Sequence, residues 1–204
     1  MATEFEHRFT PEEFLARERA SLDIKSEYVD GHIYAMAGAG LEHNEIVFNI
    51  AGALFNGLRG RPCRALINDM RVKVEKTVMY TYPDVVIVCD EPALEDAHFD
   101  TLLNPTVLVE VLSPSTERYD RGDKWAHFRQ IETLRMYVLV AQDQARVETF
   151  VQRGDEWIYE EVRGEDAVLV LEPIGCSVPL SVIYERVDLT CGRRKAGREA
   201  GNIR

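Results

Sequence analysis

Thr106-Val-Leu-Val-Glu-Val-Leu112 is the stretch that decides the fold, because five of its seven residues are Val or Leu. Side chains alternate along a strand, so one face carries Val107, Val109 and Val111, and the other carries Leu108, Glu110 and Leu112. Apolar residues on both faces predict a central strand that is covered on both sides. An unpaired buried carboxylate costs on the order of several kcal/mol, so Glu110 needs a cation, a cationic side chain or a raised pKa.

The segments around this strand alternate between helical and extended patterns. Apolar residues recur at helical spacing from Leu41 to Arg59, and a second long helix is predicted from Thr116 to Thr133. Asp30-Gly31 between two β-prone runs predicts a hairpin with a tight turn. Thr10, Pro11 and Glu13 carry the signature of a capped helix start. Further strands are expected at 63–67, 70–75, 84–89 and 136–141, followed by an antiparallel meander at 147–151, 156–162 and 167–171. The fold class is therefore α/β (mixed α+β), with a mixed central sheet flanked by helices.

Asp84 raises the same question as Glu110. It follows Tyr82-Pro83 and begins the apolar run Val85–Cys89, where it shares a face with Val86 and Val88. Two carboxylates on neighbouring strands can converge at one point and hold a hard divalent cation through oxygen ligands. The alternatives are that Asp84 is a turn or strand-start residue, and that Glu110 forms a structural ion pair with an arginine.

Two sequence motifs resemble a known family. Tyr82-Pro83-Asp84-Val85-Val86-Ile87-Val88 and Val109-Glu110-Val111-Leu112-Ser113-Pro114-Ser115-Thr116 are similar to the Uma-type family of restriction-endonuclease-like proteins, in the PD-(D/E)xK nuclease superfamily. The resemblance extends from about residue 8 to about residue 190. It implies a restriction-endonuclease-like core with a Mg²⁺ site at Asp84 and Glu110, and Mn²⁺ as a substitute metal.

The lysine of the superfamily pattern is missing from its usual place. It is expected two residues after the second acid, where this chain has Leu112. The resemblance implies that Lys124, on the following helix, takes its role. Lys124, Phe128 and Ile131 lie at i, i+4 and i+7, which places Lys124 at the end of an inward-facing stripe. The alternative is a surface salt bridge between Lys124 and Asp120, one turn earlier.

The resemblance implies a third acidic position at Glu27, for catalysis and as a metal ligand. The alternative is a solvated strand residue. His43 faces inward on its helix, as an accessory site residue or as a core histidine. Arg71 and Lys73 share a strand face with Asp69, which suits phosphate contacts or a solvated face.

Composition restricts the class of protein. The chain has 204 residues and a formal net charge of −11. The segment after Cys191 carries five basic side chains and one acidic one, so the rest of the chain has a charge of −15. We expect one domain over 1–190 and a flexible basic tail over 191–204. No apolar run is long enough to span a membrane.

The four cysteines are scattered and form no CxxC pair, so we expect neither a disulfide framework nor a zinc site, and a cytoplasmic location. Ser113 and Ser115 do not lie in a Gly-x-Ser-x-Gly motif, which argues against a serine hydrolase.

Two functions remain. The first is a Mg²⁺-dependent endonuclease that hydrolyses DNA phosphodiester bonds, with Asp84, Glu110, Lys124 and Glu27 as catalytic residues and, by resemblance, a homodimeric state. The second is a nuclease-fold protein with weak or no activity that serves as an interaction module. The retained acids favour the first function, whereas Leu112 and the negative charge favour the second.

Overall fold

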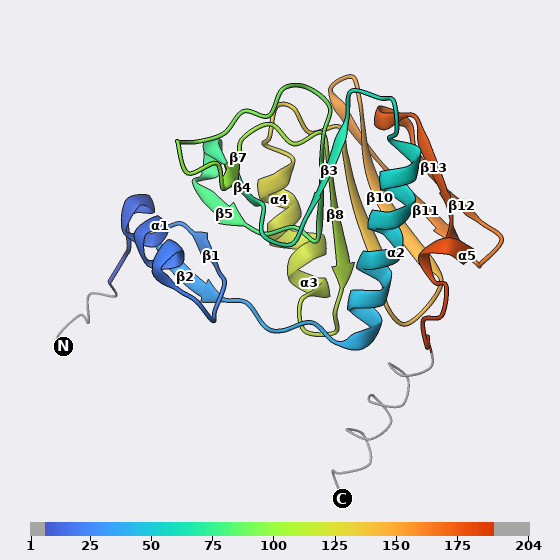
Figure 1. Ribbon diagram of the computed structural model, residues 1–204, viewed down its shortest axis with the longest axis horizontal. Helices are drawn as coiled ribbons and strands as arrows, with labels where there is room; N and C mark the ends of the chain where they lie inside the picture. The colour runs from blue at the N-terminus through green and yellow to red at the C-terminus, as the bar shows by residue number, and fades with distance from the viewer. Residues whose placement is uncertain (1–6, 190–204) are drawn as a thin grey trace, which may run out of the picture.

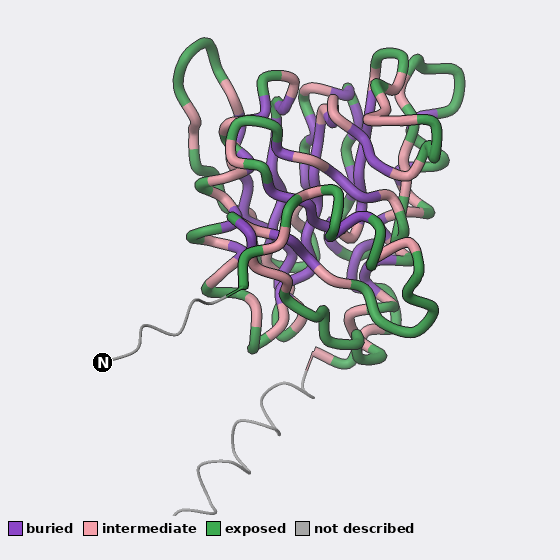
Figure 2. Tube along the Cα trace, turned by 90° about the vertical axis from the view of Figure 1, so that its left-hand side faces the viewer, coloured by how far each residue is buried: buried purple, intermediate pink, exposed green. Residues whose placement is uncertain are grey.

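The computed structural model describes residues 7–189, and the predicted tail over 191–204 lies outside them. Two sheets form most of this region (Figure 1). They pack against each other with short helical segments between them, and helix α2 (Leu41–Gly57) covers the outer face of the larger sheet. Three central strands of the larger sheet, over 85–88, 107–112 and 136–141, are buried at every residue, and buried chain fills the middle of the molecule in Figure 2.

The larger sheet is mixed, as expected, and has six strands in the order β11-β10-β9-β8-β6-β3. Its centre is β8, in which all six residues are buried. Strand β8 pairs antiparallel with β6 and parallel with β9, so the central-strand prediction for this segment is confirmed. The strands are β3 (Arg64–Ile67), β6 (Val85–Val88), β8 (Val107–Leu112), β9 (Met136–Ala141), β10 (Arg146–Arg153) and β11 (Glu156–Arg163).

The smaller sheet has five strands in the order β2-β1-β5-β4-β7. Its β1–β2 hairpin turns at Asp30 and Gly31, whose φ angles of 46° and 88° are those of a tight hairpin turn. The capping box of α1 (Pro11–Ala20) is present, with Thr10 and Glu13 bonded reciprocally. Strands β5 and β7 were not expected from the sequence. The strands are β1 (Ser26–Val29), β2 (His32–Ala35), β4 (Arg71–Val74), β5 (Met79–Thr81) and β7 (Thr101–Leu102), with the 3-10 turn η1 (Glu75–Thr77) between β4 and β5.

The second long helix is shorter than predicted and is not a regular α-helix. It consists of α3 (Glu117–Tyr119), a π-helical segment η2 (Asp120–Lys124) and α4 (Trp125–Phe128). A π-helical turn widens the helix locally, and here both of its end residues, Asp120 and Lys124, are buried. Ile131, expected on the same helix, is buried in the loop that follows.

The predicted meander is only partly correct. Strands β10 and β11 extend the larger sheet, but β12 (Val168–Leu171) leaves it and pairs with β13 (Cys176–Pro179) in a separate two-stranded sheet. The turn η3 (Glu172–Ile174) joins these strands, and α5 (Leu180–Ile183) follows. Leu169, Leu171 and Val178 pack with α2 on one face of the larger sheet, so burial against this core explains the change of sheet.

Cys63 and Cys89 form a disulfide, which the scattered spacing of the cysteines did not predict. Residues Arg64 and Val88 are paired across β3 and β6, and extending this register by one step places the two cysteines opposite each other. Sequence spacing could not reveal this pairing, because it depends on the strand register. Within residues 7–189, no helix is long and apolar enough to cross a membrane.

Candidate active site

The two acids of the sequence motifs converge, as predicted. Val85 pairs with Val109 across β6 and β8, so the same register places Asp84 opposite Glu110, with both side chains on one face of the larger sheet. The Asp84 Oδ2 atom accepts a hydrogen bond of 2.7 Å from the backbone N–H of Val111. Asp84 therefore ties the end of β6 to β8 beside Glu110.

Lys124 lies at the centre of a cluster of carboxylates. Its Nζ atom is 3.0 Å from Glu110 Oε1, 3.0 Å from Glu27 Oε1 and 3.3 Å from Asp120 Oδ1. The predicted contact with Asp120 exists, but it is buried rather than on the surface. Glu27 is also buried and accepts a short hydrogen bond from the Thr81 hydroxyl. One ammonium group thus joins the smaller sheet, the larger sheet and the π-helical segment.

Negative charge exceeds positive charge in this cluster. Glu27, Glu110 and Asp120 contact the single ammonium group of Lys124, and the charge of Asp84 acts on Glu110 from close by. Burial raises the pKa of Glu110 well above its usual range, and the neighbouring carboxylates raise it further against the opposing effect of Lys124. Burial also raises the pKa of Asp120. The excess of negative charge therefore favours the binding of protons or of a further cation at this site.

The ammonium of Lys124 stays charged despite its burial. Burial by itself lowers the pKa of a lysine, but Glu110, Glu27 and Asp120 outweigh this effect and raise the pKa of Lys124 well above its usual range. Tyr119 lies over this cation, with its ring centroid 5.5 Å from Nζ. Lys124 is therefore a fixed positive charge in the site.

His43 belongs to the site rather than only to the core. Its Nε2 atom is 3.2 Å from Asp84 Oδ2, from the first turn of α2. Its Nδ1 atom is buried and has no hydrogen-bond partner among residues 7–189. The sequence left a site role and a core role equally open, and the contact with Asp84 places His43 beside the predicted acids.

Sequence reasoning missed several residues of this region, among them Asp120 and Tyr34. Asp120 was considered only as a surface partner of Lys124, although it is buried in the cluster. Tyr34 lies opposite Glu27 in the β1–β2 pairing, so its ring is on the face of the hairpin that carries Glu27, and it is 55% exposed. The hairpin prediction contained this signal, because a two-residue turn at Asp30-Gly31 fixes the register.

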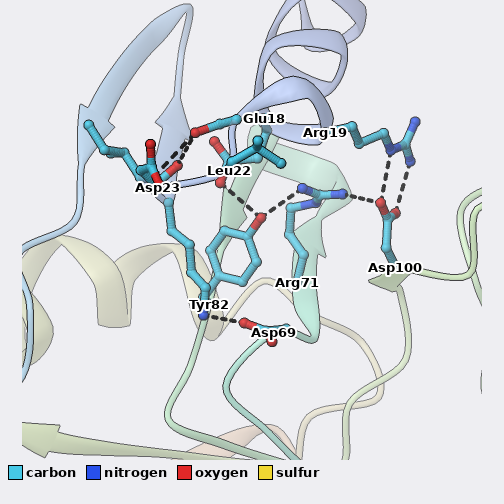
Figure 3. Close-up of a pocket in the computed structure, with 11 residues that line it drawn as sticks. Glu18, Arg19, Leu22, Asp23, Asp69, Arg71, Tyr82 and Asp100 are labelled. Carbon is cyan, nitrogen blue, oxygen red and sulfur yellow. Dashed lines mark hydrogen bonds and ion pairs between the residues drawn. The ribbon is translucent and has the colours of Figure 1, made fainter.

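Arg71 and Lys73 do not face the cluster. Both lie on the opposite face of the smaller sheet, towards α1, where Arg71 lines a cavity of about 290 Å³ (Figure 3). Arg71 donates hydrogen bonds to Thr101 Oγ1 (3.0 Å) and to the Tyr82 hydroxyl (2.8 Å), and it lies 2.8 Å from Asp100. Lys73 forms an ion pair with Glu95 at 2.6 Å. Arg71 is buried, so a solvated face was a wrong expectation for it.

The donor set suits a hard cation held by few protein ligands. Mg²⁺ is commonly bound by one or two carboxylates, with water and substrate phosphate as its other ligands. Asp84 and Glu110 supply such a pair. Among residues 7–189, however, no group of three or more His, Cys, Asp or Glu side chains is arranged to hold an ion. Glu27 and Asp120 instead contact the Lys124 ammonium.

Comparisons with known proteins find relatives that cover most of the chain. Two Synechocystis proteins, described as uncharacterized proteins sll1609 and slr1290, are each 35% identical to the chain. The first alignment covers 78% of this chain and 89% of the relative, and the second covers 87% and 92%. A crystal structure from Anabaena variabilis, described as a "putative nuclease belonging to DUF820", has the same fold. Its TM-score is 0.70 at 18% identity, over 88% of this chain and 99% of that one.

The sequence profile of the family described as "Uma2: Putative restriction endonuclease" matches residues 11–182, which include every residue of the cluster. The chain therefore belongs to the Uma2 family.

Proposed function

We propose that the chain is a divalent-metal-dependent endonuclease that hydrolyses DNA phosphodiester bonds. The observation that carries this proposal is the convergence of Asp84 and Glu110 on one face of the larger sheet, beside a buried lysine that leaves their charge only partly balanced. The family and the fold neighbour support a nuclease-type function.

Asp84 and Glu110 are the residues that would hold Mg²⁺ or Mn²⁺. The bound metal would neutralise phosphate oxygens and lower the pKa of a water molecule for attack on phosphorus. Asp84 is oriented for this task by the Val111 N–H and by His43. Its neighbour Glu110 is oriented by Lys124.

Lys124 would stabilise the negative charge that develops on the phosphate. A fixed cation in a site that excludes water is more effective than one in solution, because it needs no reorganisation during the reaction. Glu27 and Asp120 keep the ammonium in place, and we assign them this positioning role. Tyr34 stands exposed beside Glu27, where a base of the substrate could stack on its ring.

The alternative is a nuclease-fold protein that binds partners without cutting. The observation in its favour is the position of Lys124, whose ammonium group contacts one oxygen atom of each of three carboxylates. Under this alternative, Lys124 is the permanent counter-ion of a structural cluster, and no divalent cation binds.

Two measurements distinguish the nuclease from the non-cutting alternative: plasmid cleavage in Mn²⁺ or Mg²⁺, and metal titration by calorimetry. We expect Glu110→Gln and Asp84→Asn to lower the cleavage rate by at least about 100-fold, because metal catalysis contributes several kcal/mol. Both should also weaken metal binding. Glu132→Gln, which changes an exposed acid, is the matched control and should cut normally. A wild-type protein that binds neither metal would contradict the proposal.

A further inference from the structure

The edge strand β2 carries a row of side chains beside the carboxylate cluster. His32, Tyr34 and Met36 follow one another at every second position, so all three lie on one face of the smaller sheet. The Met36 N–H donates a hydrogen bond of 2.9 Å to the Lys25 carbonyl, which continues the β1–β2 pairing one residue beyond the strand. These three residues are called the β2 row below.

The β2 row is open to solvent next to the acids. Tyr34 is 55% exposed and Met36 is 36% exposed, and the ring centroids of His32 and Tyr34 are 6.3 Å apart. Because Tyr34 lies opposite Glu27, the Cβ atoms of these two residues are about 5 Å apart. The Glu27 carboxylate in turn lies 3.0 Å from the Lys124 ammonium. An exposed aromatic ring therefore stands at the border of the candidate active site.

The other face of the hairpin is already packed against the chain itself. Tyr28 and Ile33 belong to a small core with Phe14 of α1. The ring of Tyr34, on the face that carries Glu27, stays exposed within residues 7–189. Because this ring adjoins the site, a substrate held by the site is the molecule that would cover it.

The basic side chains around the site leave little charge for binding phosphates. Arg121 is paired with Glu117 at 2.7 Å and with Glu148 at 2.9 Å. On the same helical segment, Arg118 is exposed, whereas Lys124 is buried among acids. Proteins that bind duplex DNA neutralise several phosphates with Lys and Arg, and a duplex carries twice the charge per unit length of one strand. Binding at this site therefore needs contacts other than ion pairs.

Stacking on the ring of Tyr34 supplies such a contact, because every base has an aromatic face. Within a duplex, both faces of a base are covered by its neighbours, and exposing them costs unstacking energy. The bases of a single strand can be splayed out onto aromatic side chains at little cost.

We propose that the site acts on single-stranded DNA, with one base stacked on Tyr34 and a nearby phosphate at Asp84 and Glu110. The inference rests on the proposed function, from which it takes DNA as the substrate. The β2 row orders the strand beside the acids, and Arg118 is the exposed cation available for a flanking phosphate.

Fluorescence anisotropy with one labelled oligonucleotide, alone or annealed to its complement, tests the class of substrate. In EDTA, where no metal-dependent cutting occurs, the wild type should bind the single strand at least about 10-fold more tightly than the duplex. Tyr34→Ala should weaken single-strand binding by about 5- to 100-fold, because it removes the stacking ring, whereas Tyr34→Trp should retain it. Tyr159→Ala is the matched control, since this tyrosine is 52% exposed on the edge strand β11, three strands from β8. It should bind normally.

An abasic nucleotide tests the stacked base directly. In Mn²⁺, the wild type should cut the phosphate at one fixed distance from the abasic nucleotide about 5-fold more slowly or less, because the base that would stack is missing. Tyr34→Ala, which lacks the ring, should cut this phosphate and its neighbours at equal rates. A general loss of structure would not produce this coupling between one side chain and one base.

The binding results decide the inference independently of cutting. It is overturned by a wild type that binds the duplex as tightly as the single strand, or that binds neither. It is also overturned by a Tyr34→Ala protein that is folded by circular dichroism and binds the single strand like the wild type. A protein that binds the single strand through Tyr34 but cuts no DNA in Mn²⁺ or Mg²⁺ would contradict the proposed function alone.

Discussion

Glu110 shows how a single acid in an apolar strand can indicate a functional site from the sequence. Its position within an apolar strand predicted a buried acid with a compensating partner, and the structure supplies that partner as Lys124 at 3.0 Å. The partner is a lysine and not an arginine. A single ammonium group is compact enough to contact three carboxylates at once, whereas a planar guanidinium group favours paired contacts with one or two.

Removing this cation should destabilise the fold. Lys124→Gln leaves Glu27, Glu110 and Asp120 buried without their shared counter-ion, so we expect the free energy of unfolding to fall by about 3–5 kcal/mol near neutral pH. The deficit should shrink as the pH is lowered towards the raised pKa values of Glu110 and Asp120, because protonation of these two groups removes the repulsion. Urea unfolding at several pH values measures this.

The matched control is Lys76→Gln, which breaks an exposed ion pair with Glu132. Such pairs are worth about 0–1 kcal/mol, so its effect should be small at every pH. A Lys124→Gln protein as stable as the control would show that the buried acids do not need this ammonium group as a counter-ion.

The sequence predicted that Asp84 and Glu110 converge, and the family resemblance implied Lys124 beside them, but the burial of Asp120 in the same cluster was not predicted. Asp84 and Glu110 follow from strand periodicity and adjacency, which are local patterns. Asp120 and Lys124 lie one helical turn apart, so helical spacing brings them together, but their burial depends on packing against other elements of the fold, which local patterns do not reveal. Arg71 is buried on the other face of the smaller sheet, where it pairs with Asp100, 29 residues later in a loop. Strand alternation alone does not show this partner, so it suggested a solvated face.

At the scale of elements, the smaller sheet is the part that sequence patterns describe least well. Strands β5 and β7 have three and two residues, which is too few to show the alternating pattern of a strand. Longer elements such as β8 and α2 were predicted nearly to their ends, because each carries many repeats of its period. Strand β12 was predicted as a strand but assigned to the wrong sheet, since pairing depends on contacts across the fold.

Helix α1 is joined to the smaller sheet by charged groups. Arg19 forms an ion pair with Asp96. It also contacts Asp100, which in turn contacts Arg71 (Figure 3). The Arg19 guanidinium group, opposed by burial and aided by Arg71, lowers the pKa of Asp100 below its usual range. A depressed pKa of this kind adds stability above the pKa of the unfolded chain, which is about 3.9, and loses it as the pH falls further.

Asp100→Asn should therefore be destabilising in a pH-dependent way. We expect a loss of about 2 kcal/mol at pH 5–7, the range for hydrogen bonds to charged groups, and a smaller difference from wild type below about pH 4. Chemical denaturation at pH 3–7 measures the difference. Asp69→Asn, at a more exposed acid in the same cavity, is the control. A difference that stays constant down to pH 3 would contradict the ion-pair explanation.

At the scale of the whole molecule, the Cys63–Cys89 disulfide closes a loop of 26 residues between strands of the larger sheet. The entropy model gives about 3.5 kcal/mol for a loop of this length. Dithiothreitol should therefore lower the melting temperature of the wild type, and it should have no such effect on the Cys63→Ser, Cys89→Ser double variant. Equal melting temperatures of the wild type with and without reductant would mean that the bridge contributes nothing to stability.

The charge of the whole chain also bears on how it meets a substrate. A net charge of −11 repels nucleic acid at long range, and the carboxylate cluster contributes to it. Neither Arg71 nor Lys73 offsets this near the site, because their charges are matched by Asp100 and Glu95 on the far face of the smaller sheet. Residues after 189, where the basic tail lies, are outside the described structure.

The shared ammonium group of Lys124 ties together positions that are remote in the chain. Residues 27, 110 and 120 each place an acid against the same nitrogen. Replacing the lysine with a neutral residue lowers the stability of the fold while the acids remain. Removing the acids instead leaves the buried lysine without an ion-pair partner. We therefore expect residues 27, 110, 120 and 124 to vary together among related sequences. Relatives that lack the lysine should carry apolar residues in place of the acids.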